Sequence, residues 1–333
     1  MKIVVDAMGG DHAPKEIVLG ALKACEDLRL DIILVGQESR ISEYLTIPNK
    51  GSIAVVNAEK IITNEDQPVM AIRRKKDSSI VKGLNLVKEG RAQAFVSAGS
   101  TGALMAGGLF ILGRFEGVDR PAIASVIPTA KAPTLFLDIG ANSEVKPKNL
   151  TQFAQMGDIY AKEVLGRSNP KVGLLNIGIE EEKGNSIVKS AYTTLKAMEG
   201  INFIGNVEAR AFFDGDVDVV VTDGFTGNIF LKTIEGFGNY IFSGLKKEIK
   251  SRATYSLGGM LLKPALKNII SRMDYSEYGG AMFLGLNGVL IKAHGSSKSK
   301  ATFNAIRAAK QYHEAGIDER IKLSLKTNLE IML

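Results

Sequence analysis

The sequence of 333 residues has a single cysteine, Cys25, and no tryptophan. One cysteine excludes an intrachain disulfide, and this cysteine usage is typical of a protein that works in a reducing cytoplasm. Cys25 falls on an expected amphipathic helix, where a lone thiol is more typical of the core than of a nucleophile. The 45% of hydrophobic residues is ample for a large core without cross-links.

Several motifs for cofactors and nucleophiles are also missing. The chain has no GxxxxGK[ST] phosphate loop, no GxSxG motif followed by its triad, and no GxGxxG after the first strand. The three histidines are scattered, and no cluster of cysteine and histidine has the spacing of a zinc site. We expect no cofactor and assign no metal ligand, although a magnesium site at Asp11, Asp138 or Asp223 stays open.

Membrane-spanning and targeting segments are not apparent either. No apolar run reaches the about 18 residues that could cross a bilayer, and the opening MKIVVDAMGG leads directly into a strand. We expect a soluble or membrane-peripheral protein. The net charge of +6 and the pI near 9.1 allow nucleic acid, anionic lipid or an acidic protein as partner. Nucleic acid is the least favoured, because aromatic residues are not interleaved with a basic stripe.

Apolar strand-like runs alternate with helical periodicity along the chain. The first elements follow a βαβαβ order, which predicts an α/β fold with a mainly parallel open sheet and helices on both faces. Without internal repeats or long linkers, residues 1–333 should form one interwoven catalytic unit. Strands are expected over 2–7, 31–35, 52–56, 94–97, 121–128, 133–138, 171–176, 219–221 and 289–292, and helices over 16–28, 38–45, 68–76, 149–165, 186–198, about 226–250 and from 298.

Polar loops that contain glycine, or that lead directly into a helix, recur at the ends of the expected strands. At such strand ends the first helical amides lack internal partners, and glycine lets an anion approach the backbone closely. A single loop of this kind is as often an ordinary turn, whose polar residue only caps the helix, as it is an anion-binding loop. Five of them favour a composite anion site. They span 9–12, 97–102, 138–142, 183–185 and 223–228, and we expect them to converge on one pocket.

Four consecutive cations stand at the end of the expected helix 68–76: Arg73, Arg74, Lys75 and Lys76. A run of this kind is most often a solvated helix face. The alternative is a docking patch for an acidic protein or for phosphate.

The segment 253–272 has a different pattern. Its apolar residues share one half of a helix, with Lys263 and Lys267 on the other half. A basic amphipathic helix can lie on an anionic membrane surface, and the same apolar face can pack against a second subunit. Both alternatives stay open. We expect a projecting helical hairpin over 246–276, with membrane or dimer contacts at Met260, Leu261, Leu262, Leu266 and Ile269.

Long motifs in a characteristic order cover essentially the whole chain. They are VDAMGGDHAP (5–14), SAGSTGA (97–103), DIGAN (138–142), NIGIEEEKGN (176–185), GNVEAR (205–210), VVTDGFTGN (220–228) and YGGAMFLGLNGVLIKAHGSS (278–297). Together they resemble the bacterial phosphate acyltransferases of phospholipid synthesis. Ser100 stands where that family usually has asparagine, and Ala211 where aspartate is common, so position 211 is not expected to be catalytic.

The resemblance implies that inorganic phosphate takes a fatty acyl chain from acyl carrier protein. The resulting acyl phosphate would serve a membrane glycerol-phosphate acyltransferase. The resemblance also implies a homodimer, a fold similar to phosphotransacetylase and the isopropylmalate dehydrogenases, and peripheral attachment to the inner face of the cell membrane near 260–270. The run 73–76 is then the first choice for docking the acidic carrier protein.

This chemistry needs fixed positive charge and hydrogen-bond donors more than a strong base, because phosphate is largely dianionic at neutral pH. We assign Lys183 to neutralising phosphate and the oxyanion, Asn228 to a hydrogen bond with the thioester oxygen, and Asp223 to orienting one of them. His294 is a candidate proton donor to sulfur, with a structural hydrogen bond as the alternative. Expected phosphate or substrate contacts are Gly9, Gly10, Asp11, His12, Gly99, Ser100, Thr101, Gly102, Asn142, Asn185, Thr226 and Gly227.

Three other functions remain as alternatives. The chain could be a phosphotransacetylase-like enzyme that uses acyl-coenzyme A, or a metal-dependent hydroxyacid dehydrogenase of the related fold. It could also be a non-catalytic scaffold for lipid enzymes at the membrane surface, which the polar strand-end loops speak against.

Overall fold

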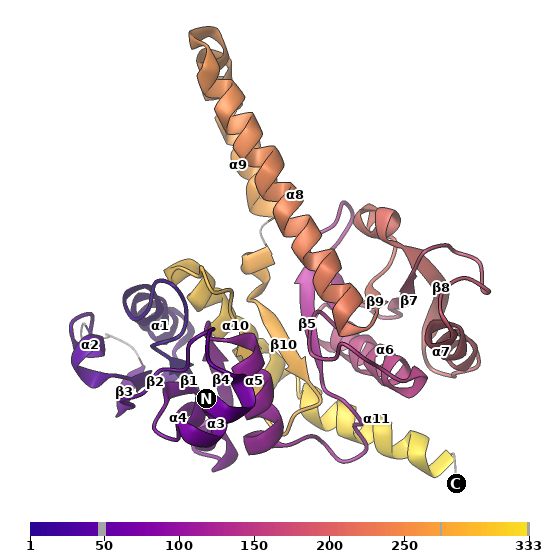
Figure 1. Cartoon of the computed structure of the whole chain (residues 1–333), viewed down its shortest axis with the longest axis horizontal. Helices are drawn as coiled ribbons and strands as arrows, with labels where there is room; N and C mark the ends of the chain where they lie inside the picture. The colour runs from indigo at the N-terminus through magenta and orange to yellow at the C-terminus, as the bar shows by residue number, and fades with distance from the viewer. Residues whose placement is uncertain (46–50, 274, 332–333) are drawn as a thin grey trace.

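The computed structural model describes residues 1–45, 51–273 and 275–331, and for 253, 268–273, 275–276 and 326–331 it describes the backbone alone. Eleven strands of this part form one sheet through the body of the molecule (Figure 1). The strands are β1 (Lys2–Asp6), β2 (Asp31–Gly36), β3 (Ser52–Asn57), β4 (Ala94–Ser97), β5 (Ala122–Ile127), β6 (Thr134–Leu137), β7 (Lys171–Asn176), β8 (Asn202–Glu208), β9 (Val219–Val221), β10 (Ala281–Leu284) and β11 (Val289–Lys292).

Helices cover both faces of this sheet, which confirms the predicted fold class. They are α1 (Lys15–Leu28), α2 (Glu38–Ser42), α3 (Pro68–Arg74), α4 (Ser79–Lys88), α5 (Thr101–Gly107), α6 (Pro147–Glu163), α7 (Ser186–Lys196), α8 (Gly224–Ser251), α9 (Ala253–Met273), α10 (Ser299–Glu314) and α11 (Ile317–Ile331), with a π-helical turn η1 (Gly108–Leu112) and 3₁₀ turns η2 (Ala209–Asp214) and η3 (Tyr275–Tyr278).

The sheet consists of two parallel sets that run in opposite directions. The strand order is β3-β2-β1-β4-β11-β10-β5-β6-β9-β7-β8. The first five strands are parallel, and so are the last four. Between the sets, β11, β10, β5 and β6 pair antiparallel in succession. The pairings Ser97–Lys292, Lys292–Ala281, Ala281–Ser125 and Ser125–Phe136 form one row, so the ends of β4, β11 and β6 meet in the middle of the sheet.

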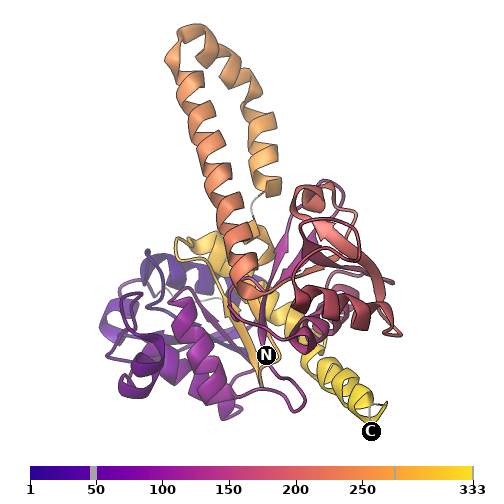
Figure 2. The same ribbon diagram turned by 45° about the vertical axis from the view of Figure 1, so that its right-hand side comes forward.

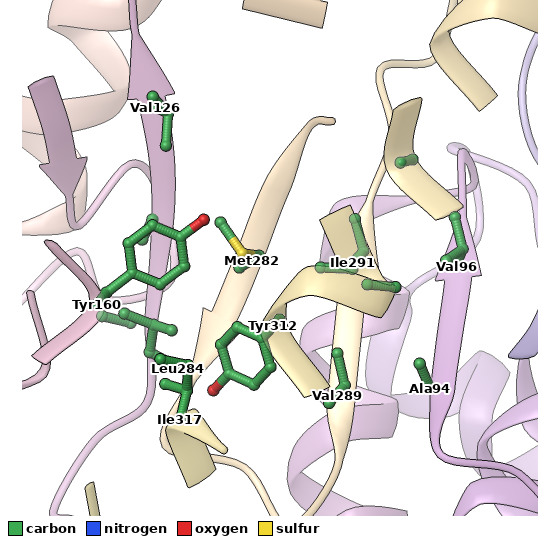
Figure 3. Packing of buried hydrophobic residues seen from close by; sticks show 14 of the residues in the cluster. Ala94, Val96, Val126, Tyr160, Met282, Leu284, Val289, Ile291, Tyr312 and Ile317 are labelled. Atoms are coloured by element: carbon green, nitrogen blue, oxygen red, sulfur yellow. The ribbon is translucent and has the colours of Figure 1, made fainter. Parts of the chain in front are cut away.

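One face of the sheet carries a continuous apolar core. Every second strand residue points to this face, as the pleat requires, from Ile32 in β2 to Val172 in β7. Helices α1, α6, α7, α10 and α11 cover it. Figure 3 shows its centre, where Tyr160 and Tyr312 from two helices pack over Met282 and Leu284 of β10. This core spans both parallel sets and joins them into one unit.

The opposite face is covered by two separate clusters. The first lies under α3, α4, α5 and η1 and includes Phe95 and Ile123. The second, at the other end of the sheet, includes Phe136, which stacks on Phe230 of α8 with ring centroids 4.9 Å apart. The partly buried Ile139 contacts both clusters. The interruption between them positions the site described below.

Helices α8 and α9 form a long hairpin that projects from the body (Figures 1 and 2). The two helices approach closely: a Cβ at Gly259 would lie 2.4 Å from Cγ2 of Ile249. The predicted segment 246–276 lies within this hairpin and its return to the sheet, although α8 begins much earlier, at Gly224. None of the helices in the described part is long and apolar enough to span a bilayer.

Most predicted elements appear within a few residues of their expected bounds. The strand β8 was not predicted, because its pattern is broken: its register with β7 skips Ile204, and Gly205 has a φ of +96°. The helix predicted from 298 is in fact two helices, separated at Gly316, where φ is +63°. Strand β10 and helix α4 were also missed.

Candidate functional site

A cavity of about 630 Å³ lies over the middle of the sheet, between the two clusters of the divided face. Its floor includes Ser125, Ala281 and Lys292 from the row in which the strand ends meet. The first turn of α5 and the second and third turns of α8 face it from its two sides. The remaining lining residues are Pro68, Val69, Thr101, Gly102, Met105, Ala106, Leu109, Phe110, Ile123, Ile139, Gly140, Ala141, Asn228, Leu231, Lys232, Glu235, Gly280, Ala293 and His294.

Lys292 is the cation of the cavity floor. It ends β11, and its Nζ donates to the carbonyl oxygens of Ala98, at 3.3 Å, and of Ala293. Burial lowers the pKa of Lys292 to about 8, and the nearby charge of Lys232 acts in the same direction, while Asp11 and Asp6 oppose it. Two carbonyls hold the ammonium group, and among the described residues no carboxylate forms an ion pair with it, so its charge can act on a bound anion.

His294 stands two residues beyond Lys292 and faces the cavity. Its Nδ1 accepts from the amide of Ser296 at 3.3 Å and lies 2.8 Å from the Ser296 hydroxyl, which places the proton of the neutral ring on Nε2. Burial lowers the pKa of His294; Glu235 opposes this shift and the Lys232 cation adds to it. The ring is therefore neutral near pH 7 and can offer an N–H to a ligand.

The α8 wall adds three polar side chains at helical spacing. Asn228, Lys232 and Glu235 all line the cavity, and Lys232 Nζ pairs with Glu235 Oε2 at 2.7 Å. Asn228 also lies against Gly140, whose added Cβ would be 3.7 Å from the Cβ of Asn228. The loop after β6 and the start of α8 thus lie together, and Gly140, Ala141 and Asn228 from these predicted segments reach the cavity lining.

Loops 9–12 and 97–102 also lie together, next to Lys292 on the cavity floor. The buried Asp6 accepts from the hydroxyl of Ser97 at 2.6 Å and from the amide of Met8 at 3.0 Å. Burial raises the pKa of Asp6 despite these bonds. The amide of Gly99 donates to Ser97 Oγ, at 3.0 Å. This network holds both loops against each other.

Of the residues predicted in these two loops, Thr101 and Gly102 line the cavity. The amide of Asp11 donates to the carbonyl of Gly295 at 2.8 Å, and its carboxylate is close enough to act on the pKa values of Lys292 and His294. The other predicted residues support the loops: Gly9, Gly10, His12, Gly99 and Ser100 are not among the residues that line the cavity in the described part of the chain. A Cβ at Gly9 would lie 2.6 Å from both Asp6 Oδ2 and the amide of Gly99.

Asp138 organises the loop after β6. Its carboxylate accepts from four backbone amides, those of residues 123, 140, 141 and 142, and from Nδ2 of Asn142. Burial nevertheless raises the pKa of Asp138. Asn142 also donates to the carbonyl of Pro121 at 2.8 Å and is buried away from the cavity lining. The structure therefore places Asn142 in a supporting position.

Three further predicted residues shape the start of α8. Asp223 is the N-cap: its Oδ1 accepts from the amide of Thr226 and its Oδ2 from the Thr226 hydroxyl, both at 2.8 Å. Gly227 is buried, and its amide donates to the carbonyl of Asp223 at 2.9 Å. A Cβ at Gly227 would lie 1.8 Å from the carbonyl oxygen of Asp138. These residues place Asn228 at the cavity without lining it themselves.

Lys183 and Asn185 lie at the same edge of the sheet, but β9 separates their strand, β7, from β6. Asn185 caps α7 by accepting from the amide of Val188 at 2.9 Å. The Lys183 side chain is exposed, and within the described residues of one chain neither side chain lines the cavity. The expected convergence therefore holds for four loops to different degrees and not for 183–185.

The basic run on α3 borders the cavity mouth. The guanidinium of Arg73 lies over the ring of Phe110, 5.5 Å from its centroid. Arg74 and Lys76 are exposed, whereas Lys75 is tied to Asp66 by an ion pair of 2.6 Å and to the carbonyl of Ile61. Lys75 of this run therefore supports the local fold, and the other three cations form an exposed patch.

Sequence reasoning missed Lys292, Ser125 and the pair formed by Lys232 and Glu235. The one available signal was a lysine at the end of the otherwise apolar strand VLIK. The described residues contain no group of three or more histidine, cysteine or acidic side chains arranged to hold a metal.

Comparisons with known proteins agree with this picture. The family model described as "Fatty acid synthesis protein" matches residues 1–320. Among solved structures, a phosphotransacetylase from Streptococcus pyogenes aligns with a TM-score of 0.60 at 16% identity, over 94% of each chain. EutD phosphotransacetylase from Staphylococcus aureus aligns with a TM-score of 0.58 at 20% identity, over 93% of this chain and 94% of that one. At these identities the likeness shows the fold.

Curated relatives match over nearly their full lengths. The phosphate acyltransferase of Bacillus pumilus is 51% identical over 319 residues, which cover 95% of each chain. The phosphate acyltransferase of Clostridium tetani is 52% identical over 335 aligned positions, which cover 100% of both chains. The chain belongs to the phosphate acyltransferase family.

Proposed function

We propose that this acyltransferase transfers a fatty acyl group from acyl carrier protein to inorganic phosphate and so forms acyl phosphate for phospholipid synthesis. The observation that carries the proposal is the two-sided cavity. One wall, formed by α8, the end of β11 and the loop after it, presents Lys232, Lys292 and His294, whereas the wall formed by α5 and η1 is apolar beyond Thr101, with Met105 and Leu109. An anion and an acyl chain can therefore bind side by side.

In the proposed reaction a phosphate oxygen forms a bond to the thioester carbonyl carbon, the C–S bond breaks, and a thiolate leaves. Phosphate is already largely dianionic, and a pantetheine thiol resembles cysteine, with a pKa of about 8.5, so neither step needs a strong base or acid. The difficulty is to bring two anionic partners together and to hold the oxyanion. Fixed cations and N–H donors meet that need.

The residues then take the following roles. Lys292 neutralises phosphate and the developing oxyanion, and Thr101 in the first turn of α5 holds a phosphate oxygen. Asn228 donates to the thioester oxygen, and Asp223 orients it as the cap of α8. His294, neutral at pH 7, supplies a hydrogen bond from Nε2 to the leaving sulfur rather than a whole proton.

Lys183 keeps its proposed role only across subunits. Since it lies outside the cavity lining of its own chain, it would act in the cavity of a second copy in a homodimer. Ile177 and Ile179 of the same loop are 81% and 67% exposed, and so are large parts of Phe225 and Ile229 on α8. These apolar residues support a dimer contact near the site. Mixing Lys183→Ala with Asn228→Ala chains should restore activity that each variant lacks; no recovery would contradict shared sites.

The direct test is to incubate the purified protein with palmitoyl carrier protein and labelled phosphate and to look for acyl phosphate. Palmitoyl-coenzyme A is the parallel donor. Product from coenzyme A alone would favour the phosphotransacetylase-like alternative, and no product from either donor would overturn the proposal. Asn228→Ala should lower the rate about 100- to 1,000-fold, the usual loss for one oxyanion donor; a change of only a few-fold would contradict its role.

The exposed part of the run 73–76 is the proposed dock for the acidic carrier protein. Reversing the charge of Arg73 and Arg74 should raise the KM for acyl carrier protein and flatten its dependence on salt. Lys75 should be left intact, because its ion pair with Asp66 supports the local fold. An unchanged KM would remove this docking surface.

The far end of the hairpin is the proposed contact with the inner face of the cell membrane, where a glycerol-phosphate acyltransferase would take up the product. Met260, Leu261 and Leu262 of α9 are 64%, 80% and 58% exposed. Leu266 is partly exposed, and the side chain of Ile269 lies outside the described residues. Leu261→Glu combined with Leu266→Glu should abolish sedimentation with liposomes and spare activity. Loss of the dimer instead would favour the subunit contact.

A further inference from the structure

A second cavity of about 630 Å³ adjoins the first and shares two lining residues with it, Leu109 and Phe110. Both belong to η1, a π-helical turn of the kind that often marks functional sites. Phe110 is 55% exposed although it is large and apolar. The remaining lining residues are Arg114, Asp119, Arg120, Glu144, Val145, Lys146 and Asn149.

Cations outnumber carboxylates in this second cavity, and a partly buried network holds the backbone segments that carry them. Asp119 Oδ2 accepts from Nδ2 of the buried Asn149 at 2.7 Å, and Asn149 Oδ1 accepts from the amide of Lys146 at 2.7 Å. Arg114 donates to the carbonyl of Asp119. In the described part of the chain the side chains of Arg120 and Lys146 form no ion pair. Two charges there are thus available to an incoming anion.

The shared residues connect this basic cavity to the apolar wall of the first. A ligand that extends from the reaction site across Leu109 and Phe110 would be apolar or neutral over that stretch and anionic beyond it. Arg73 of the α3 run adds a further cation beside this stretch, because its guanidinium lies over the ring of Phe110. Such a sequence of environments fits a long neutral arm with a phosphate at its far end.

We propose that the second cavity binds the phosphodiester of a pantetheine arm, with the arm lying across Leu109 and Phe110 and its thioester in the first cavity. The inference rests on the proposed function and names the part of the acyl donor that the enzyme recognises. Guanidinium groups suit a phosphodiester because they present several N–H donors in a planar fork. Acyl carrier protein carries this arm through a phosphodiester and coenzyme A through a diphosphate, so both present an anionic phosphate at the end of the arm.

The test compares 4′-phosphopantetheine with pantetheine, which differ in the phosphate alone. Arg120→Glu combined with Lys146→Glu should weaken equilibrium binding of phosphopantetheine at least about tenfold, as the loss of charge-assisted bonds implies, and leave pantetheine binding unchanged. Lys148→Glu, two residues after Lys146 in the first turn of α6 but outside the lining, is the matched control and should bind both compounds like the parent. Equal binding of both compounds by parent and variant would overturn the proposal.

Steady-state rates separate the two possible sources of the arm. The double reversal should raise the KM for palmitoyl carrier protein and for palmitoyl-coenzyme A by similar factors, with the KM for phosphate unchanged. A rise with the carrier protein alone would mean that the reversal disturbs protein docking, which contradicts a phosphate site. A rise in the KM for phosphate would contradict it as well.

The binding assay uses neither an acyl group nor free phosphate, so its result stands apart from the reaction. Selective loss of phosphopantetheine binding in a protein that forms no acyl phosphate would sink the proposed function and keep the arm site. Acyl phosphate formation by a protein that binds phosphopantetheine and pantetheine equally would support the proposed function and overturn the arm site.

Discussion

The two faces of the central sheet are covered in different ways. On one face, α1, α6, α7, α10 and α11 lay a continuous apolar layer under both parallel sets of strands. On the other, the layer is interrupted over the middle of the sheet, where Ser125 and Lys292 point into a cavity. The closed face stabilises the fold and the interrupted face carries the chemistry.

The interruption has a topological cause. Helix α5 follows β4 and α8 follows β9, and these strands belong to sets that run in opposite directions. Helix α5 packs over the first cluster of this face, whereas α8 leaves the sheet and projects from the body (Figure 1), so the two helices diverge from the row of strand ends. The first turn of α5 and the second turn of α8 are left facing that row. Thr101 and Asn228 therefore meet across one cavity although 127 positions of sequence separate them.

The largest expected effect is the loss of stability on truncating a core side chain of the closed face, and it tests whether the two faces have separate roles. Phe153→Ala removes a fully buried ring from α6 and should lower the free energy of unfolding by about 3–5 kcal/mol. The kcat/KM of the folded fraction should stay near that of the parent. Leu231→Ala on the interrupted face, which already lines a cavity, is the control and should cost clearly less stability. If urea unfolding shows that both variants lose the same free energy of unfolding, the two faces do not have separate roles.

Removing the floor cation should give the reverse result. Lys292→Met should lower kcat/KM about 100- to 1,000-fold, because it removes electrostatic stabilisation at the reacting phosphate. The melting temperature should not fall, since a partly desolvated charge is lost with it. The exposed Lys88→Met is the matched control. Activity within a few-fold of the parent would remove Lys292 from the site.

The pKa of Lys292 predicts how phosphate binding depends on pH. Burial lowers this pKa to about 8, so the side chain is charged below that pH and loses its charge above it. The KM for phosphate should rise about tenfold per pH unit above 8, as the protonated fraction falls. Lys292→Arg keeps its charge and should flatten the profile, whatever its effect on rate. A pH-independent KM in the parent between 8 and 10 would refute this reading.

On the closed face, Asp318 should make the stability depend slightly on pH. Burial raises the pKa of Asp318 to about 6, although Tyr312 donates to its carboxylate at 2.7 Å. An acid whose pKa is raised by folding is penalised where it is ionised, so its cost appears as pH rises from about 4 to 6. Asp318→Asn should therefore add about 1 kcal/mol at pH 7 and nothing at pH 4.

Urea unfolding at the two pH values measures this difference. The kcat/KM should not change, since Asp318 packs with α10 on the face away from the cavity. A variant that gains the same stability at both pH values would show that the carboxylate is not the cause.

Local patterns predicted much of this architecture. The apolar strands and the helices expected from 186 and from about 226 follow from residue type and spacing within about ten positions, because the interactions involved are themselves local. The same patterns also placed Thr101, Gly102, Asn228 and His294 at strand or helix ends, and all four line the cavity.

The remainder required the tertiary structure. Strand order and direction arise from pairings between distant segments, and the central antiparallel strands reverse one half of the sheet. The strand order leaves Lys183 outside the cavity of its own chain, because β9 lies between β7 and β6, and it brings the end of β11, with Lys292, to the cavity floor. The sequence by itself determined which segments become strands, helices and capped loops. Only the three-dimensional packing decided which loop ends share a pocket, because that depends on register across strands far apart in the chain.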